Sequence, residues 1–212
     1  MKFGLGAILV ATSLPGATPT TSKPNASLTC EKTELFKAHG VKVWSSSDPA
    51  PTLYYKSGLA IDADGAYRAY HPDHRSGLDS LNHAGHRANW WALVTDNNKP
   101  SGKPVVQSAS DPAPGYYVST TALFDPNITD IRNPRRYVEA GTIPYVVLHP
   151  KALKNAQLGD FATVVNFQNG KVSGAVVADV SAPNLPVAKD RSRWRTHWAS
   201  IPMHERAASR TA

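Results

Sequence analysis

The sequence of 212 residues contains a single cysteine, Cys30, and no long run of apolar residues. One cysteine excludes an internal disulfide framework and any zinc or iron–sulfur site built from several cysteines. No stretch reaches the roughly 18 apolar residues that a membrane-spanning helix requires. A Gly-x-Ser-x-Gly nucleophile elbow, a glycine-rich phosphate loop, a dinucleotide fingerprint and an internal repeat are also missing. These absences leave carboxylate side chains as the remaining candidates for catalytic chemistry.

Turn-forming residues are plentiful. The chain has 14 glycines and 17 prolines, with 41% hydrophobic and 18% charged residues. This composition is sufficient for a hydrophobic core and favours many turns over long helices. The length fits one domain with a short appendage at either end.

Strand-like segments dominate the middle of the chain. They are short, aromatic or β-branched, and separated by Gly, Pro, Asp or Asn. A short helix is expected over Leu28–His39, closed by Gly40. Strands are expected at residues 41–44, 52–56, 66–70, 90–94, 116–120, 143–148, 161–167 and 172–178.

Two of these segments, 161–165 and 175–178, are almost continuously apolar, which predicts strands buried on both faces. The pair Asn169-Gly170 between them favours a two-residue hairpin turn, because both residue types tolerate positive φ. The sequence therefore predicts a mainly β fold, a single compact barrel- or sandwich-like domain over residues 28–182 with one or two short helices.

The N-terminus resembles a secretory signal. One basic residue, Lys2, precedes an apolar segment that ends at Leu14, and small residues lie near Ala17. Residues 1–17 are therefore expected to be a signal peptide of a secreted protein, and the alternative is a disordered or strand-forming leader. Residues 18–27 are rich in Thr, Pro and Ser and have the composition of a linker.

The C-terminal segment 183–212 is basic. It carries +4 of the formal net charge of +7, and it contains two tryptophans without apolar periodicity. Such a tail could bind an anionic polymer.

Asp179 is the first candidate for chemistry. It follows the apolar segment Gly174–Ala178, and a strand could fix this carboxylate at the mouth of a cleft. The structural alternative is an aspartate that accepts a hydrogen bond from its own backbone.

Asp62 and Asp64 form the second candidate, in the sequence Ile-Asp-Ala-Asp-Gly. Two carboxylates one residue apart could bind a cation or the amine of a substrate. The pattern is also that of an ordinary solvated turn, and Gly65 is not followed by the remaining ligands of an EF-hand.

Two further polar groupings are ambiguous. The segments His71–His74 and His83–His86 could bind zinc, but they lack helical periodicity, so surface histidines are the simpler interpretation. Glu139 could orient the strand that follows it or line a site.

Five segments occur in an order that resembles the glycoside hydrolase family 75 chitosanases. The likeness covers roughly residues 52–182, and its segments are Tyr55–Ala66, Asn89–Leu93, Thr142–Leu148, Gly159–Val165 and Val172–Asp179. The resemblance implies a secreted enzyme that cleaves the β-1,4 linkages of chitosan with inversion. It also implies that Asp179 is a catalytic carboxylate.

Further expectations follow from this resemblance. Asp62 and Asp64 are expected to contact the amines of the substrate, and aromatic faces are expected to contact its sugar rings; the candidates are Tyr54, Tyr55, Tyr70, Trp90 and Trp91. A positively charged protein repels a cationic polymer, so attraction must be local, from Asp62, Asp64, Asp160 and Asp179 gathered in one groove. The expected partner is chitosan or a related polysaccharide, bound by a monomer without metal, cofactor, nucleic acid or membrane.

The second catalytic carboxylate of the family is missing. A Glu is expected about ten residues after Asp179, in a Gly-Glu-Gly-Ser-like segment before a small apolar helix, but residues 186–194 contain no Glu. A one-base shift of the codons from Val187 onward permits Gly-Glu-Gly-Ser-Val-Ser-Leu-Ala-His-Ala-Leu-Gly-Ile. Our hypothesis is that a frameshift near codons 183–186 replaced the family's C-terminus.

Two alternatives to hydrolysis stay open. The domain could bind carbohydrate without cleaving it, or the basic tail could bind polyanions. The first predicts binding without the release of reducing ends. The second predicts binding that falls steeply with salt and is lost when residues 183–212 are deleted.

Overall fold

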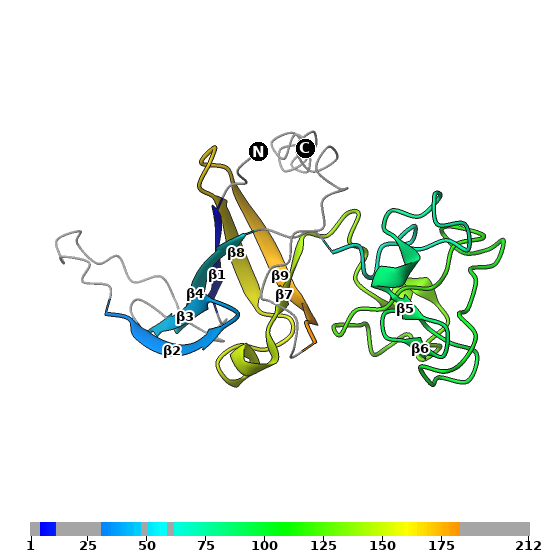
Figure 1. The fold of residues 1–212 in the computed structure, drawn as a ribbon, viewed down its shortest axis with the longest axis horizontal. Coiled ribbons are helices and arrows are strands. Elements are labelled where there is room, and N and C mark those ends of the chain that lie inside the picture. Colours follow the sequence, from blue (N-terminus) through cyan, green and yellow to red (C-terminus); the bar gives the residue numbers. More distant parts are fainter. Residues whose placement is uncertain (1–4, 12–30, 48–50, 59–61, 183–212) are drawn as a thin grey trace. The chain divides into compact units, whose positions relative to one another are not determined.

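The computed structural model describes residues 5–11, 31–47, 51–58 and 62–182. These residues form two compact units. The first draws on Met1–Leu59 and Tyr145–Lys189, and the second on Ala60–Pro144. The expected linker and the basic tail lie outside the described residues. Strands and turns make up both units, and the longest helical element described is a 3-10 helix of five residues, so the predicted mainly β fold class is confirmed (Figure 1).

A seven-stranded sheet forms the frame of the first unit, in the order β2-β3-β4-β1-β8-β9-β7. Neighbouring strands are antiparallel except for β7 and β9, which are parallel. Among the described strands the sheet is open, with β2 and β7 at its edges, so the barrel form of the prediction is not realised. The strands are β1 (Leu5–Ala11), β2 (Thr33–Ala38), β3 (Val41–Ser46), β4 (Thr52–Gly58), β7 (Tyr145–Leu148), β8 (Phe161–Asn166) and β9 (Val172–Val180).

Strand β1 comes from the segment that resembles a secretory signal. It pairs with β4 on one side, Leu5 opposite Gly58, and with β8 on the other, Gly6 opposite Asn166. This position in the middle of the sheet corresponds to the strand-forming alternative for the N-terminus. Cleavage after residue 17 would remove this strand from between β4 and β8.

One face of the sheet carries the core of the first unit. Side chains of a strand alternate between the two faces, so Leu53 and Tyr55 of β4 point to the same side, and Val43 of β3 lies opposite Tyr55. The 3-10 helix η3 (Pro150–Lys154) adds Ala152 to the same cluster. The fully buried members include Val177 and Leu148 at the β9 and β7 end of the sheet.

The helix expected over Leu28–His39 is a wrong prediction for its described part, because Thr33–Ala38 forms strand β2. The turn at His39-Gly40 explains the error. Both residues have positive φ, 48° and 85°, and they join β2 to β3 as a two-residue hairpin. A glycine of positive φ also ends helices, so Gly40 satisfied both interpretations, and the pairing with β3 decided between them.

The hairpin of β8 and β9 is confirmed, but its loop is longer than predicted. The Asn166 N–H donates to the Lys171 carbonyl, so the loop between the two strands consists of the four residues 167–170. Gly170 alone has positive φ, 70°. Burial on both faces is wrong for residues 161–165, since Phe161 is 68% exposed, whereas the consecutive residues Val177 and Ala178 of the second segment are both fully buried.

The second unit consists mostly of turns. Its regular elements are η1 (Leu81–His83), β5 (Gly85–His86), β6 (Asn89–Trp90) and η2 (Pro134–Arg136). The expected strands at residues 90–94 and 116–120 are reduced to β6 and to isolated bridges, which pair Leu93 with Ser119 and Val106 with Tyr117.

The strand expected at residues 66–70 is absent from the structure. Ala63, Ala66 and Ala69 are all buried, and the Ala66 and Ala69 N–H groups donate to carbonyls three residues earlier. Successive turns therefore bury the alanine at every third position, and this packing overrides the strand preference of Tyr67 between them. None of the described helices has the length and apolar character needed to cross a bilayer.

Candidate functional site

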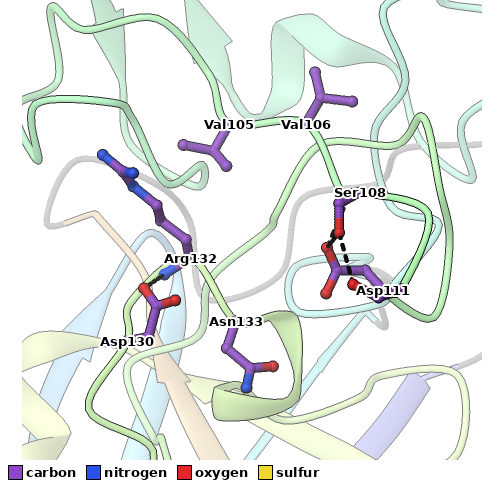
Figure 2. Close-up of a pocket in the computed structure, with 8 residues that line it drawn as sticks. Val105, Val106, Ser108, Asp111, Asp130, Arg132 and Asn133 are labelled. Atoms are coloured by element: carbon purple, nitrogen blue, oxygen red, sulfur yellow. Dashed lines mark hydrogen bonds between the residues drawn. The ribbon is translucent and has the colours of Figure 1, made fainter.

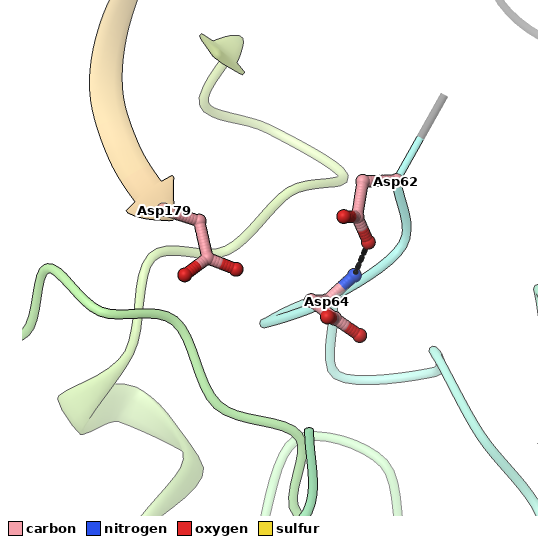
Figure 3. A group of neighbouring side chains, drawn as sticks. All are labelled: Asp62, Asp64 and Asp179. Carbon is pink, nitrogen blue, oxygen red and sulfur yellow. Dashed lines mark hydrogen bonds between the residues drawn. The ribbon is translucent and has the colours of Figure 1, made fainter. Parts of the chain in front are cut away.

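Asp62 and Asp64 lie in a tight turn of the second unit. The Asp64 N–H donates to Asp62 Oδ1 at 3.0 Å, which is the bond of an Asx turn (Figure 3). The next residue, Gly65, donates its N–H to Ser119 Oγ at 3.0 Å, and that hydroxyl donates to the Ala92 carbonyl. The carboxylate pair is therefore attached to the interior of its unit.

A buried tyrosine holds the second carboxylate of this turn. Tyr70 is 1% exposed, and its hydroxyl donates to Asp64 Oδ1 at 2.6 Å. Burial, and then the negative charges of Asp64 and Asp62, raise the pKa of Tyr70 well above its ordinary value. The phenol therefore keeps its proton at neutral pH and remains the donor that fixes the Asp64 carboxylate.

Two buried tyrosines provide a matched test of this bond. Tyr70→Phe removes a donor to a carboxylate, and we expect the free energy of unfolding to fall by about 1.5–3 kcal/mol. Tyr55 is 3% exposed, and its hydroxyl has no hydrogen-bond partner among the described residues. Tyr55→Phe should therefore leave the stability unchanged or raise it by about 1 kcal/mol. Urea unfolding of both variants measures the difference, and equal effects would contradict the assignment.

Alkaline pH should destabilise the protein through the same two residues. Burial raises the pKa of Tyr55 as well as that of Tyr70 above the ordinary value of 10. Above pH 10 the unfolded chain loses phenolic protons that the folded chain keeps, so the free energy of unfolding decreases as pH rises. Each residue contributes a slope of up to about 1.4 kcal/mol per pH unit. Each Phe variant should reduce the slope measured by unfolding between pH 10 and 11, and an unaltered slope in both would refute the prediction.

Asp179 lies inside β9, one residue before the strand ends at Val180, rather than after the strand as predicted (Figure 3). Its neighbourhood contains a β-bulge: Val146 pairs with Val177, and the next residue of β7, Val147, pairs with Asp179. The extra residue is Ala178. A bulge redirects the side chains that follow it, so it sets the direction of Asp179.

The carboxylate of Asp179 also contacts its own backbone. Its Oδ1 accepts a hydrogen bond from the Val180 N–H at 2.8 Å. The functional and the structural interpretations of Asp179 are therefore compatible, because the strand fixes its position while one oxygen holds the strand end. Asp62 and Asp64 are brought together within the second unit, and Asp179 belongs to the first.

Asp160, expected to add a carboxylate to the same groove, is a structural residue. It is 3% exposed, and its Oδ2 accepts the Gln157 N–H at 2.8 Å. Its backbone N–H and carbonyl bond to Gln157 and Val177. Its expected role in attracting substrate is therefore wrong.

A cavity of about 370 Å³ lies in the second unit and is lined by two valines and six polar residues (Figure 2). Neither Asp62 nor Asp64 contributes to it. Its polar groups bond to one another or to the backbone: Ser108 Oγ donates to Asp111 Oδ2 at 2.7 Å, and Asp130 Oδ1 accepts the Arg132 N–H at 2.9 Å. The expected groove around the predicted carboxylates is therefore not this cavity.

The histidine-rich segments do not form a metal centre among the described residues. No described histidine belongs to a group of three or more potential ligands. His71 Nδ1 accepts the Asp73 N–H, and His86 Nδ1 contacts the Arg87 carbonyl. His83 instead pairs with Asp79 at 2.7 Å, a partner that their spacing of four residues could have indicated.

Glu139 connects two turns of the second unit. Its Oε2 accepts the Tyr67 N–H at 2.9 Å, and its Oε1 accepts the Gly141 N–H at 2.8 Å. Both oxygens accept from backbone donors, so Glu139 holds the turn at Gly141 against the turn at Tyr67.

The five aromatic candidates differ in exposure. Tyr55 and Tyr70 are buried, and Tyr54 stacks on Trp44 with 5.8 Å between ring centroids. Trp90 packs against a core cluster of the second unit. Trp91 is 57% exposed and presents the most accessible surface of the five.

Neither the protein-family models nor the curated proteins contain a match to this chain. Fold and site together define a mainly β protein of two units, with an anchored pair of carboxylates in one unit and a strand-borne carboxylate in the other.

Proposed function

We propose that the protein is a chitosanase-like glycoside hydrolase that acts on β-1,4-linked glucosamine polymers. The ordered resemblance of five segments over residues 52–182 supports this assignment. The observation that carries it is the position of Asp179, the residue that matches the family's catalytic aspartate. The β9 strand and the bulge beside Ala178 fix this residue within the sheet.

The mechanism requires two carboxyl groups. In an inverting glycosidase one carboxylic acid protonates the leaving oxygen and one carboxylate activates water, and the two carboxyl groups lie about 6.5–9.5 Å apart. Asp179 is assigned the role of the base toward water. The acid is assigned to the Glu that a one-base frame change would supply after Asp179, and this Glu is missing from the chain as it stands.

The pair Asp62 and Asp64 is assigned to substrate binding. A turn that carries two negative charges attracts the ammonium groups of glucosamine over short distances, although the net charge of the protein is +7. The Tyr70 hydroxyl fixes one of the two carboxylates, so little side-chain freedom is lost when a sugar binds.

Carbohydrate binding without hydrolysis is the second candidate. The missing Glu and the exposed ring of Trp91 favour it for this chain. Release of reducing ends from chitosan, measured together with binding to chitosan, separates the two candidates. The chain as it stands should bind and release few reducing ends, and a chain with the alternative C-terminal frame should hydrolyse. Hydrolysis at an enzyme-like rate by the present chain would overturn the assignment of the missing Glu, and loss of chitosan binding in both chains would overturn the proposal.

A further inference from the structure

We propose that Trp91 is a stacking platform for an uncharged pyranose, the N-acetylglucosamine unit of a partly acetylated chitosan chain. This inference depends on the proposed function only for the identity of the polymer, which is chitosan. It adds a binding position in the second unit and a preference for the acetylated sugar at that position.

The indole of Trp91 is fixed along one edge. Its Nε1–H donates to the His83 carbonyl at 3.0 Å, and its backbone N–H donates to the Ala84 carbonyl at 3.1 Å. The side chain nevertheless remains 57% exposed. A ring that is fixed before binding loses little conformational entropy when a ligand covers it.

The support of this ring is itself anchored. His83 is the last residue of η1, and its Nδ1 lies 2.7 Å from Asp79 Oδ1. The same oxygen of Asp79 accepts the Ser80 N–H at 2.7 Å. The imidazole of His86 lies beside the indole, with 6.2 Å between ring centroids and an interplanar angle of 81°. The contact with Asp79 therefore holds His83, whose carbonyl accepts the indole N–H.

The surroundings of the ring favour an uncharged ligand. The apolar C–H face of a pyranose can pack on the exposed indole, as apolar groups pack on aromatic rings elsewhere. An ammonium group would need a carboxylate nearby to compensate for lost hydration. Asp79 is the carboxylate that supports this segment, and it is already paired with His83. Cation–π attraction alone is weak at an exposed ring. The acetamido group of N-acetylglucosamine carries no charge, so this sugar needs no carboxylate beside the ring.

The test compares two hexasaccharides by calorimetry at pH 5.5, one of N-acetylglucosamine and one of glucosamine, whose amines are protonated at this pH. We expect Trp91→Ala in the full chain to weaken binding of the acetylated hexamer at least about tenfold, which corresponds to 1.4 kcal/mol. The affinity for the glucosamine hexamer should change by less than about threefold, which is clearly smaller than the tenfold loss expected for the acetylated hexamer. Trp91→Phe, which keeps a ring but loses the N–H donor, should fall between the wild type and the Ala variant.

Trp44→Phe serves as the matched control, since Trp44 is a stacked tryptophan of the first unit and should leave both affinities unchanged. If Trp91→Ala fails to fold, as judged by circular dichroism, Trp91→Phe alone decides. Failure of the wild type to bind the acetylated hexamer would overturn the inference. An equal loss for both hexamers, or an equal loss in the Trp44 variant, would do the same. The proposed function fails separately, if the alternative-frame chain does not release reducing ends.

Discussion

Asp179→Asn is expected to lower chitosan hydrolysis at least about a hundredfold in a chain that carries the alternative C-terminal frame. The amide cannot take a proton from water, so the general base is lost. Its oxygen can still accept the Val180 N–H, as Asp179 Oδ1 does at 2.8 Å, so the strand should keep its structure. Release of reducing ends gives the rate, and thermal unfolding reports whether the fold is retained.

Three companion variants make this test specific. Changing the Glu of the restored Gly-Glu-Gly-Ser segment to Gln should cause a loss of similar size, because the acid would then be missing. Asp64→Asn should weaken chitosan binding and reduce hydrolysis mainly at low substrate concentration. Asp73→Asn changes an exposed carboxylate of the second unit and should have no effect on the rate. Retention of hydrolysis in Asp179→Asn would remove Asp179 from the catalytic assignment.

Gly65→Ala is expected to destabilise the second unit by more than about 3 kcal/mol and to displace the Asp62–Asp64 turn. Gly65 has a φ of 80°, a conformation that L side chains rarely adopt. An added Cβ would also overlap the Val138 carbonyl and lie 2.7 Å from Thr121 Cγ2. The carbonyl belongs to the backbone and cannot rotate away. Hydrogen exchange of the second unit, with chitosan binding as the functional readout, measures the effect.

Gly170→Ala separates the two causes of this destabilisation. Gly170 has a similar φ of 70°, but an added Cβ there would meet no atom within 4 Å. It should therefore show only the strain of the left-handed conformation, about 1 kcal/mol. If the two variants destabilise their units equally, the close approach of Val138 to Gly65 has no energetic role.

The sequence predicted the regular strands of the first unit well. Residues 41–44, 52–56 and 172–178 all lie in strands, because β-branched and aromatic side chains, which favour strands, are frequent there. The same pattern failed at residues 66–70, where three buried alanines at a spacing of three favour consecutive turns. The strand preference of the side chains decides the local structure where neighbouring strands can pair with the backbone. Where turns bury the side chains instead, as at residues 66–70, this preference is overridden.

Gly40 and Asn169-Gly170 show why turns were harder to predict than strands. A glycine after an apolar segment is compatible with a helix end and with a hairpin, and only the partner strand β3 distinguishes them at Gly40. At the second turn, the pairing of Asn166 with Lys171 set the loop length. Both outcomes depend on contacts between segments that a local pattern does not contain.

The mainly β class and the carboxylates Asp62, Asp64 and Asp179 could be chosen from the sequence alone, because alternation and residue type are local properties. Tertiary structure alone decided that a buried tyrosine anchors Asp64, that Asp160 is buried, and that Trp91 is exposed whereas Tyr55 is not. The physical reason is that burial and hydrogen-bond partners come from residues distant in the chain, and two aromatic residues of similar character differ only in what packs around them.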